Sequence, residues 1–143
     1  MSKETETPQA GTRSVVIERV MPHPPEKIWR ALTQSAMMAE WLMPNDFEAK
    51  QGHEFKMTWS NNGYSGVIDS KVTAIEPHSK LAYTWASMGV DTLVTFTLVP
   101  EAGGTRLRME QSGFDPANKQ ALGGAMHGWT GFLEKLETVV GKA

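Results

Sequence analysis

The 143-residue sequence contains no cysteine, and this absence excludes three kinds of chemistry. Without thiols the chain has no disulfide, no thiolate metal ligand and no cysteine nucleophile. The sequence also lacks an excess of charge of one sign, because 14 basic residues stand against 16 acidic ones. A nucleic-acid-binding protein is typically basic, so we expect no nucleic-acid partner.

Long apolar runs are missing too, since none approaches the roughly 18 residues that a membrane-spanning helix needs. The first residues are polar and include no hydrophobic segment of the kind found in a signal peptide. The length matches the commonest size of one domain. We therefore predict a frayed tail over residues 1–12, a single domain over residues 13–143, no membrane span and a cytoplasmic location.

Local patterns predict one strand, two short helices and then a meander of strands. The β-branched run over residues 14–20 is typical of a strand. Pro25 suits the first position of a helix that continues to about residue 34, and Ser35 can cap a second helix over residues 36–42. From residue 46 to 112 apolar and polar residues alternate, which predicts antiparallel strands, with a hairpin turn at Asn61-Asn62-Gly63.

The C-terminal segment predicts a long amphipathic helix. Asp115 suits the N-cap and Pro116 the first helical position. Apolar residues then recur at spacings of three and four, which places them in one stripe facing the sheet: Leu122, Met126, Trp129, Leu133, Leu136 and Val140.

Four glycines interrupt the same helix. Each costs about 1 kcal/mol relative to alanine inside a helix. By helical spacing, Gly124 and Gly131 project away from the stripe, while Gly123 and Gly128 flank it. Two interpretations remain open. A neighbouring element packs closely against bare backbone, or the first half of the helix is soft enough to admit a ligand.

Seven short motifs, in this order, resemble the START-like (SRPBCC) helix-grip superfamily and, more narrowly, the family named after the C-terminal domain of the activator of the heat-shock-protein-90 ATPase. They are Pro25-x-x-Ile28-Trp29-x-Ala31-Leu32-Thr33, Trp41-Leu42-x-Pro44, Gly52-x-x-Phe55, Ile75-Glu76-Pro77, Leu81-x-Tyr83-Thr84-Trp85, Gln111-Ser112-Gly113-Phe114 and Gly128-Trp129-x-x-x-Leu133-x-x-Leu136.

The resemblance implies an α+β helix-grip fold. A curved antiparallel sheet of about six to seven strands wraps around the long C-terminal helix, two short helices follow the first strand, and a cavity lies between sheet and helix. The name-giving ATPase activation needs a separate amino-terminal domain, for which 143 residues leave no room. We therefore do not expect that activity here.

Strand and helix parity predict which side chains face this cavity. Three of them are polar: Ser70, Tyr83 and Gln111 either orient a ligand or bond to each other and to the backbone inside the protein. The predicted cavity residues are Trp41, Met57, Trp59, Ile68, Ser70, Tyr83, Trp85, Val94, Phe96, Met109, Gln111, Leu122, Met126 and Trp129. Five tryptophans and nine methionines are generous for this length, and they fill either a dense core or the walls of an adaptable cavity.

Catalytic signatures are absent from the sequence. The four histidines share no ligand spacing, and each is expected on the surface. In the family motif many relatives carry histidine where this sequence has Gln111, which cannot exchange protons near neutral pH. We assign no catalytic residue, metal or cofactor.

The sequence favours binding of a small hydrophobic or aromatic molecule. Two alternatives are an enzyme similar to the aromatase/cyclase or hydrolase members of the superfamily, and a protein-interaction module, either a homodimer or a co-chaperone-like partner. An enzyme would need a titratable group inside the cavity. An interaction module would need an exposed apolar patch elsewhere.

Overall fold

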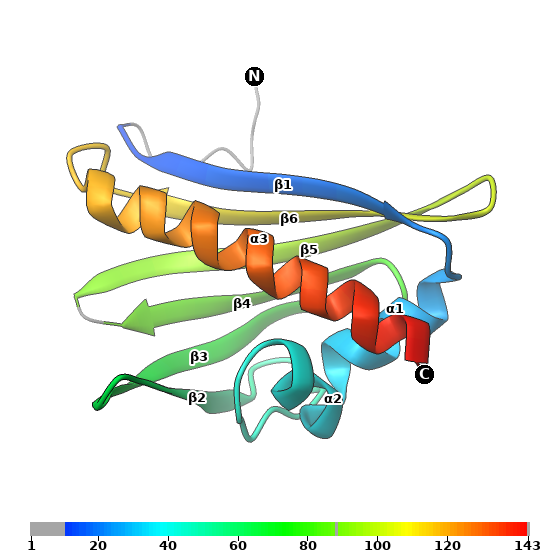
Figure 1. The fold of residues 1–143 in the computed structure, drawn as a ribbon, viewed down its shortest axis with the longest axis horizontal. Coiled ribbons are helices and arrows are strands. Elements are labelled where there is room, and N and C mark those ends of the chain that lie inside the picture. The colour runs from blue at the N-terminus through cyan, green and yellow to red at the C-terminus, as the bar shows by residue number, and fades with distance from the viewer. Residues whose placement is uncertain (1–10, 88, 143) are drawn as a thin grey trace.

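The computed structural model describes residues 11–87 and 89–142. The predicted tail therefore falls, for residues 1–10, outside the described residues. Six strands and three helices follow one another along the described chain (Figure 1). They are β1 (Arg13–Met21), α1 (Pro25–Thr33), α2 (Ser35–Trp41), β2 (Glu54–Asn61), β3 (Tyr64–Glu76), β4 (Lys80–Ser87), β5 (Val90–Glu101), β6 (Gly104–Phe114) and α3 (Lys119–Lys142).

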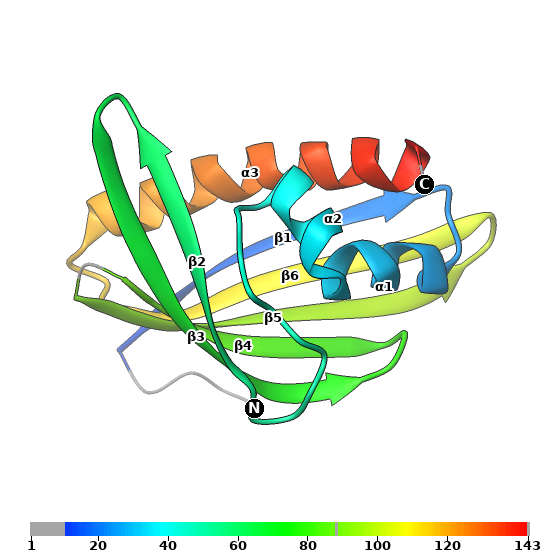
Figure 2. The same cartoon turned by 90° about the horizontal axis from the view of Figure 1, so that it is seen from below.

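The strands form one antiparallel sheet in the order β1-β6-β5-β4-β3-β2. Helix α3 crosses one face of this curved sheet, and α1 and α2 lie on the same face near the C-terminal half of α3 (Figures 1 and 2). The expected α+β helix-grip fold is thus confirmed, with six strands. None of the helices in the described residues is both long and apolar enough to cross a membrane.

The β2–β3 hairpin has the predicted turn. Asn61 pairs with Tyr64, and the two turn residues, Asn62 and Gly63, have φ values of 52° and 84°. Both are left-handed, as a two-residue hairpin turn requires. The hairpin tip lies at the same end of the molecule as the start of α3 (Figures 1 and 2).

Within this hairpin the side chain of Trp59 lies flat on bare backbone. Trp59 is paired with Gly66 across the two strands. A Cβ placed on Gly66 would come within 2.5 Å of the Trp59 indole nitrogen. The missing side chain of Gly66 therefore leaves the space that the Trp59 ring occupies, and Trp59 forms part of a groove described below.

The helix-facing side of the sheet forms the core, as the alternation predicts. Leu81, Tyr83, Val94 and Phe96 are buried there, and so is the C-terminal half of α3 through Leu133, Leu136, Val139 and Val140. The core also takes in the side chains of Ile28, Leu32, Met38 and Trp41 from the two short helices.

The prediction that Met126 belongs to the buried stripe is wrong, because its side chain is 45% exposed. At about 100° per residue, the residues that contact the core centre on Trp129 and Leu136 and extend toward Phe132 and Val139. Met126 lies at the opposite border of this face. Periodicity gives the width of an apolar stripe but not its rotation against the sheet.

Two helix starts also differ from the prediction. Helix α3 begins at Lys119, one turn later than expected, because Asn118 is the capping residue: its Oδ1 accepts the backbone N–H of Ala121 at 3.0 Å. Asp115 instead accepts the N–H of Ala117 at 2.9 Å in the turn before the helix. Helix α2 begins at Ser35, whose hydroxyl donates to the carbonyl of Asn45 rather than capping the helix.

The position of the α3 cap can be tested with two alanine variants. We expect Asn118→Ala to lower the free energy of unfolding by about 1 kcal/mol, because an orphan helix N–H loses its acceptor. Asp115→Ala removes only a turn contact and is expected to cost clearly less. Urea unfolding of both variants provides the comparison, and a larger loss for Asp115→Ala would contradict the assignment.

Candidate functional site

Two adjoining hollows lie between the N-terminal half of α3 and the sheet. The first, which we call the inner cleft, has a volume of about 240 Å³ and lies between α3 and the ends of β4, β5 and β6. Its walls are Trp85, Ser87, Val90, Gln111, Phe114, Ala121, Gly124, Ala125, Gly128, Trp129 and Phe132. Only Ser87 and Gln111 among them have polar side chains.

The second hollow, which we call the outer groove, has a volume of about 1130 Å³ and is bounded by α3, the β2–β3 hairpin and the chain from Ala39 to Pro44. Trp59, Ile68 and Lys135 are among its wall residues. Trp85, Gly124, Gly128 and Phe132 line both hollows. The two spaces therefore meet where these four residues stand.

Aromatic rings form the floor shared by the core and the inner cleft. The ring centroid of Trp129 lies 5.4 Å from that of Trp85, 5.5 Å from that of Phe132 and 5.8 Å from that of Phe96. These are the separations at which tilted and edge-to-face pairs are favourable. Trp85 and Phe132 are only half-buried and so present ring surface to the hollows.

A chain of three hydrogen bonds ties α3 to three strands beneath the cleft. The indole N–H of Trp129 donates to Oε1 of Gln111 at 2.7 Å. Nε2 of Gln111 donates to the hydroxyl of Thr92 at 2.8 Å, and that hydroxyl donates to the carbonyl of Trp85 at 3.1 Å. Gln111 is 3% exposed, so these bonds satisfy polar groups that water scarcely reaches.

The four glycines between Gly123 and Gly131 do not pack closely against a neighbouring element. A Cβ built on Gly123, Gly124 or Gly131 meets no atom of the described residues within 4 Å, and one on Gly128 meets only Phe132 at an ordinary 3.9 Å. Close packing of a neighbouring element is therefore not the reason for these glycines. The predicted orientation of Gly124 is also wrong: it faces both hollows, because the buried face of α3 is rotated toward Phe132.

Two buried hydroxyls have no hydrogen-bond partner within the described part of the chain: Ser70 Oγ and Tyr83 Oη. The Tyr83 ring is 1% exposed and is surrounded by Phe47, Phe55 and Phe96. Burial in this apolar environment raises the pKa of the Tyr83 phenol well above its ordinary value near 10. The phenol therefore stays protonated.

The predicted cavity residues separate into four groups. Trp85, Gln111 and Trp129 line the inner cleft, while Trp59, Ile68 and again Trp85 line the outer groove. Leu122 is half-buried and Met126 is exposed. The remainder are buried and line neither hollow: Trp41, Met57, Ser70, Tyr83, Val94, Phe96 and Met109. A role in ligand binding remains a prediction for each of the fourteen residues.

Sequence reasoning missed several walls of the inner cleft, namely Ser87, Val90, Phe114, Ala121, Gly124, Ala125, Gly128 and Phe132. Gly128 is expected beside the apolar stripe and Gly124 away from it, and only the rotation of α3 shows that both line the cleft. No group of three or more residues able to hold a metal occurs in residues 11–87 and 89–142.

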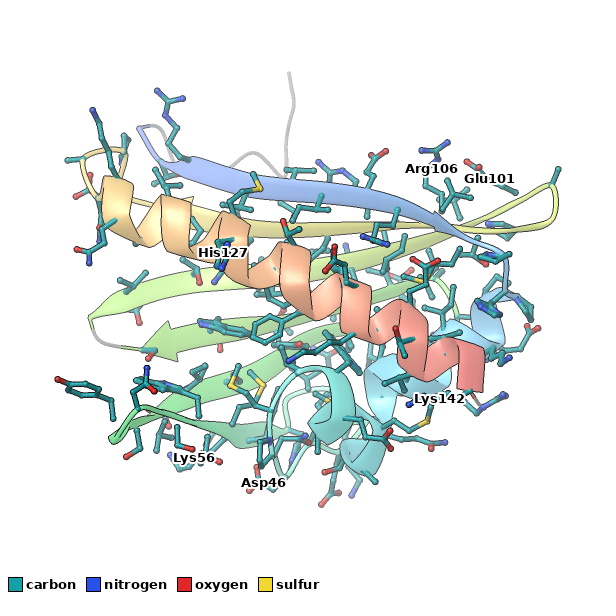
Figure 3. All side chains as sticks on the ribbon, viewed as in Figure 1. Asp46, Lys56, Glu101, Arg106, His127 and Lys142 are labelled. Atoms are coloured by element: carbon teal, nitrogen blue, oxygen red, sulfur yellow. The ribbon has the colours of Figure 1, made fainter. Side chains whose placement is uncertain are left out.

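A third hollow, of about 490 Å³, lies on the opposite face of the sheet over β2, β3 and β4. Its rim consists largely of exposed charged side chains, among them Lys56, which is paired with Asp69. Figure 3 shows Lys56 and the nearby Asp46 on this side of the molecule. The hydrogen bond and the charge of Asp69 raise the pKa of Lys56. We interpret this hollow as a solvated, ion-paired surface.

The fold, with a sheet gripping a long helix and hollows between them, defines the class of helix-grip proteins. More narrowly, the chain belongs to the family described as Activator of Hsp90 ATPase homolog 1-like protein, whose family model matches residues 22–141. Comparison with curated proteins gave no match.

Solved structures support this assignment. The chain is similar to MLL2253 from Mesorhizobium loti, with 48% sequence identity, a TM-score of 0.86 and coverage of 92% of this chain and 98% of that one. It is also similar to BH1534 from Bacillus halodurans, with 29% identity, a TM-score of 0.76 and coverage of 90% and 96%. DynU16, from the dynemicin biosynthetic locus, shares the fold at 23% identity and a TM-score of 0.74, with coverage of 87% and 46%.

The unpartnered Tyr83 hydroxyl gives a test of the core. We expect Tyr83→Phe to leave the free energy of unfolding at pH 7 unchanged or to raise it by up to about 1 kcal/mol, since it removes a buried hydroxyl that has no partner among the described residues. Above about pH 10 the unfolded wild type releases the phenolic proton while the folded state keeps it. Wild-type stability should then fall by up to about 1.4 kcal/mol per pH unit through this group.

In Tyr83→Phe, the free energy of unfolding should lack the part of the decline above pH 10 that this phenol causes. The matched control is Tyr64→Phe, because the sequence has two tyrosines and Tyr64 is 74% exposed; this variant should keep the wild-type decline. Urea unfolding at pH 7, 9 and 11 measures all three proteins. Equal alkaline slopes for wild type and Tyr83→Phe would contradict the buried, neutral phenol.

Proposed function

We propose that this protein binds a small, largely apolar molecule in the inner cleft, with room for the molecule to extend into the outer groove. One observation carries the proposal. The cleft is bordered by bare helix backbone at Gly124 and Gly128, one turn apart, where a Cβ would meet no atom of the described residues within 4 Å at Gly124 and only Phe132, at an ordinary 3.9 Å, at Gly128.

These glycines lower the stability of the helix without helping it to pack. Each is worse than alanine by about 1 kcal/mol in a helix interior, and methyl groups at both positions would fit without overlap. A ligand that lies against the helix backbone would explain the glycines, because side chains at these positions would occupy its space. The aromatic rings of Trp85 and Phe132 on the same walls favour a flat molecule.

The chemistry of the walls favours binding over catalysis. The described walls of the inner cleft hold no carboxylate, imidazole, amine or phenol, and Lys135 is the one titratable side chain in the outer groove. Proton transfer in the cleft would need a group with a pKa near the working pH. Tyr83 does not supply it, since its phenol lies in the core outside both hollows and is held protonated.

The interaction-module alternative finds less support in the described surface. Val20 and Val99 are exposed on the face of the sheet opposite α3, but the register places Arg106 between them. Arg106 is paired with Glu101 and Glu18, and Figure 3 shows Arg106 beside Glu101. Charged residues thus interrupt the exposed apolar ones, and a homodimer or chaperone partner remains a weaker proposal.

Filling the cleft from the helix tests the proposal. We expect Gly124→Leu to weaken binding of N-phenyl-1-naphthylamine, an uncharged dye that fluoresces in apolar surroundings, by at least about tenfold, because the new side chain occupies the cleft. The dye titration is followed by fluorescence at constant protein concentration.

Gly123→Leu is the matched control. It makes the same change in helix propensity one residue earlier, at a position that lines neither hollow. It should bind the dye as the wild type does. Failure of the wild type to bind, or equal binding by both variants, would overturn the inner cleft as the binding site.

A further inference from the structure

Gln111 is the buried polar side chain in the wall of the inner cleft, and its orientation can be deduced. An indole nitrogen is a donor only. The atom of Gln111 that lies 2.7 Å from the Trp129 indole nitrogen must therefore be the carbonyl oxygen, Oε1. The amide nitrogen, Nε2, is then the atom facing Thr92 at 2.8 Å.

The rest of the chain follows from this orientation. Because Nε2 only donates, the hydroxyl oxygen of Thr92 must accept, and its own hydrogen is free to donate to the carbonyl of Trp85. Every donor in the chain points the same way, from α3 through β6 and β5 to β4. No reversal of the amide is compatible with the Trp129 contact.

One of the two amide hydrogens of Gln111 is left without an acceptor in the described part of the chain. Nε2 carries two hydrogens and Thr92 takes one; the second has no partner within the described residues. Oε1 already has a partner in Trp129. A buried N–H without an acceptor is rarer and more unfavourable than a carbonyl that uses one of its two lone pairs. Gln111 itself forms part of the cleft wall.

We propose that the inner cleft selects molecules that carry a hydrogen-bond acceptor, a carbonyl or ether oxygen on a flat apolar frame, and that the second N–H of Gln111 binds this oxygen. The inference rests on the proposed function and adds the chemical class of the ligand to it. Ser87 is the other polar side chain of the walls and is only half-buried, whereas Gln111 is 3% exposed; the buried donor of Gln111 therefore decides the orientation of the bound molecule.

A matched pair of probes tests the selection. Indane and 1-indanone are flat bicyclic molecules that differ by one carbonyl oxygen. We titrate both into 15N-labelled wild type and Gln111→Glu and follow the nitrogen–hydrogen signals by NMR. Glutamate retains an oxygen for the Trp129 indole but lacks the second N–H. Indane serves as the internal reference, because its dissociation constant reports any general damage to the cleft.

We expect the ratio of the two dissociation constants to shift against 1-indanone by about tenfold in Gln111→Glu, as expected for a buried carbonyl that loses its donor. In the wild type, 1-indanone and not indane should move one side-chain amide proton signal of Gln111 downfield. Using a ratio cancels the different hydration of the two probes in water.

Two outcomes would overturn the inference. If both probes shift the Trp85 and Trp129 indole signals, but the ratio does not change and the Gln111 amide signal does not move, the cleft binds without this selection and the proposed function stands. If neither indane nor 1-indanone binds but the naphthylamine dye does, the proposed selection by Gln111 is wrong, while the proposed function stands. If the dye fails as well, the proposed function falls with it.

Discussion

The arrangement of this fold depends on how Trp129 is buried. A tryptophan side chain brings a large apolar surface and one N–H that needs an acceptor when water is excluded. Trp129 packs on Phe96 and Trp85 in the sheet, and its N–H reaches Gln111 on β6. This bond fixes how far α3 is rotated and shifted against the strands, because other registers would leave a buried donor and a buried acceptor unpaired.

The rotation of α3 determines where space remains. Along its C-terminal half the helix contacts α1 and α2 as well as the sheet, and the apolar residues on both borders of its stripe are buried. Along its N-terminal half no second helix of the described residues lies beside it, and the β2–β3 hairpin lies across the sheet from it (Figure 1). The inner cleft and the outer groove occupy this uncovered part.

Much of the fold could be predicted from the sequence, because strand parity and turn chemistry are local. The alternation around Phe55, Tyr83 and Phe96 gave the buried face, and Asn62-Gly63 gave the hairpin. The cleft could not be predicted in the same way, since it depends on side chains that are absent at Gly124 and Gly128. The exposure of Met126 could not be predicted for the same reason, because the rotation of a helix against a sheet is set by tertiary packing and not by local sequence.

The polar residues illustrate a similar division. Sequence parity placed Ser70, Tyr83 and Gln111 inside, and all three are buried. It left open whether they orient a ligand or bond within the protein, and the structure separates them. Gln111 has partners on both sides, whereas the hydroxyls of Ser70 and Tyr83 have none in the described residues. Such pairings bring together residues 18 or 19 positions apart, which no local pattern encodes.

The uneven distribution of glycine gives α3 two different local stabilities. Four glycines fall between Gly123 and Gly131, whereas the stretch from Phe132 to Val140 has none and buries Leu133, Leu136, Val139 and Val140. Opening the first two turns exposes little apolar surface, while opening the last two exposes much of the core. Amide hydrogens near Gly124 should therefore exchange with solvent through local fraying, and those near Leu136 only through opening close to global unfolding. The part of α3 that borders the cleft near Gly124 is thus the part whose local opening needs the smallest free energy.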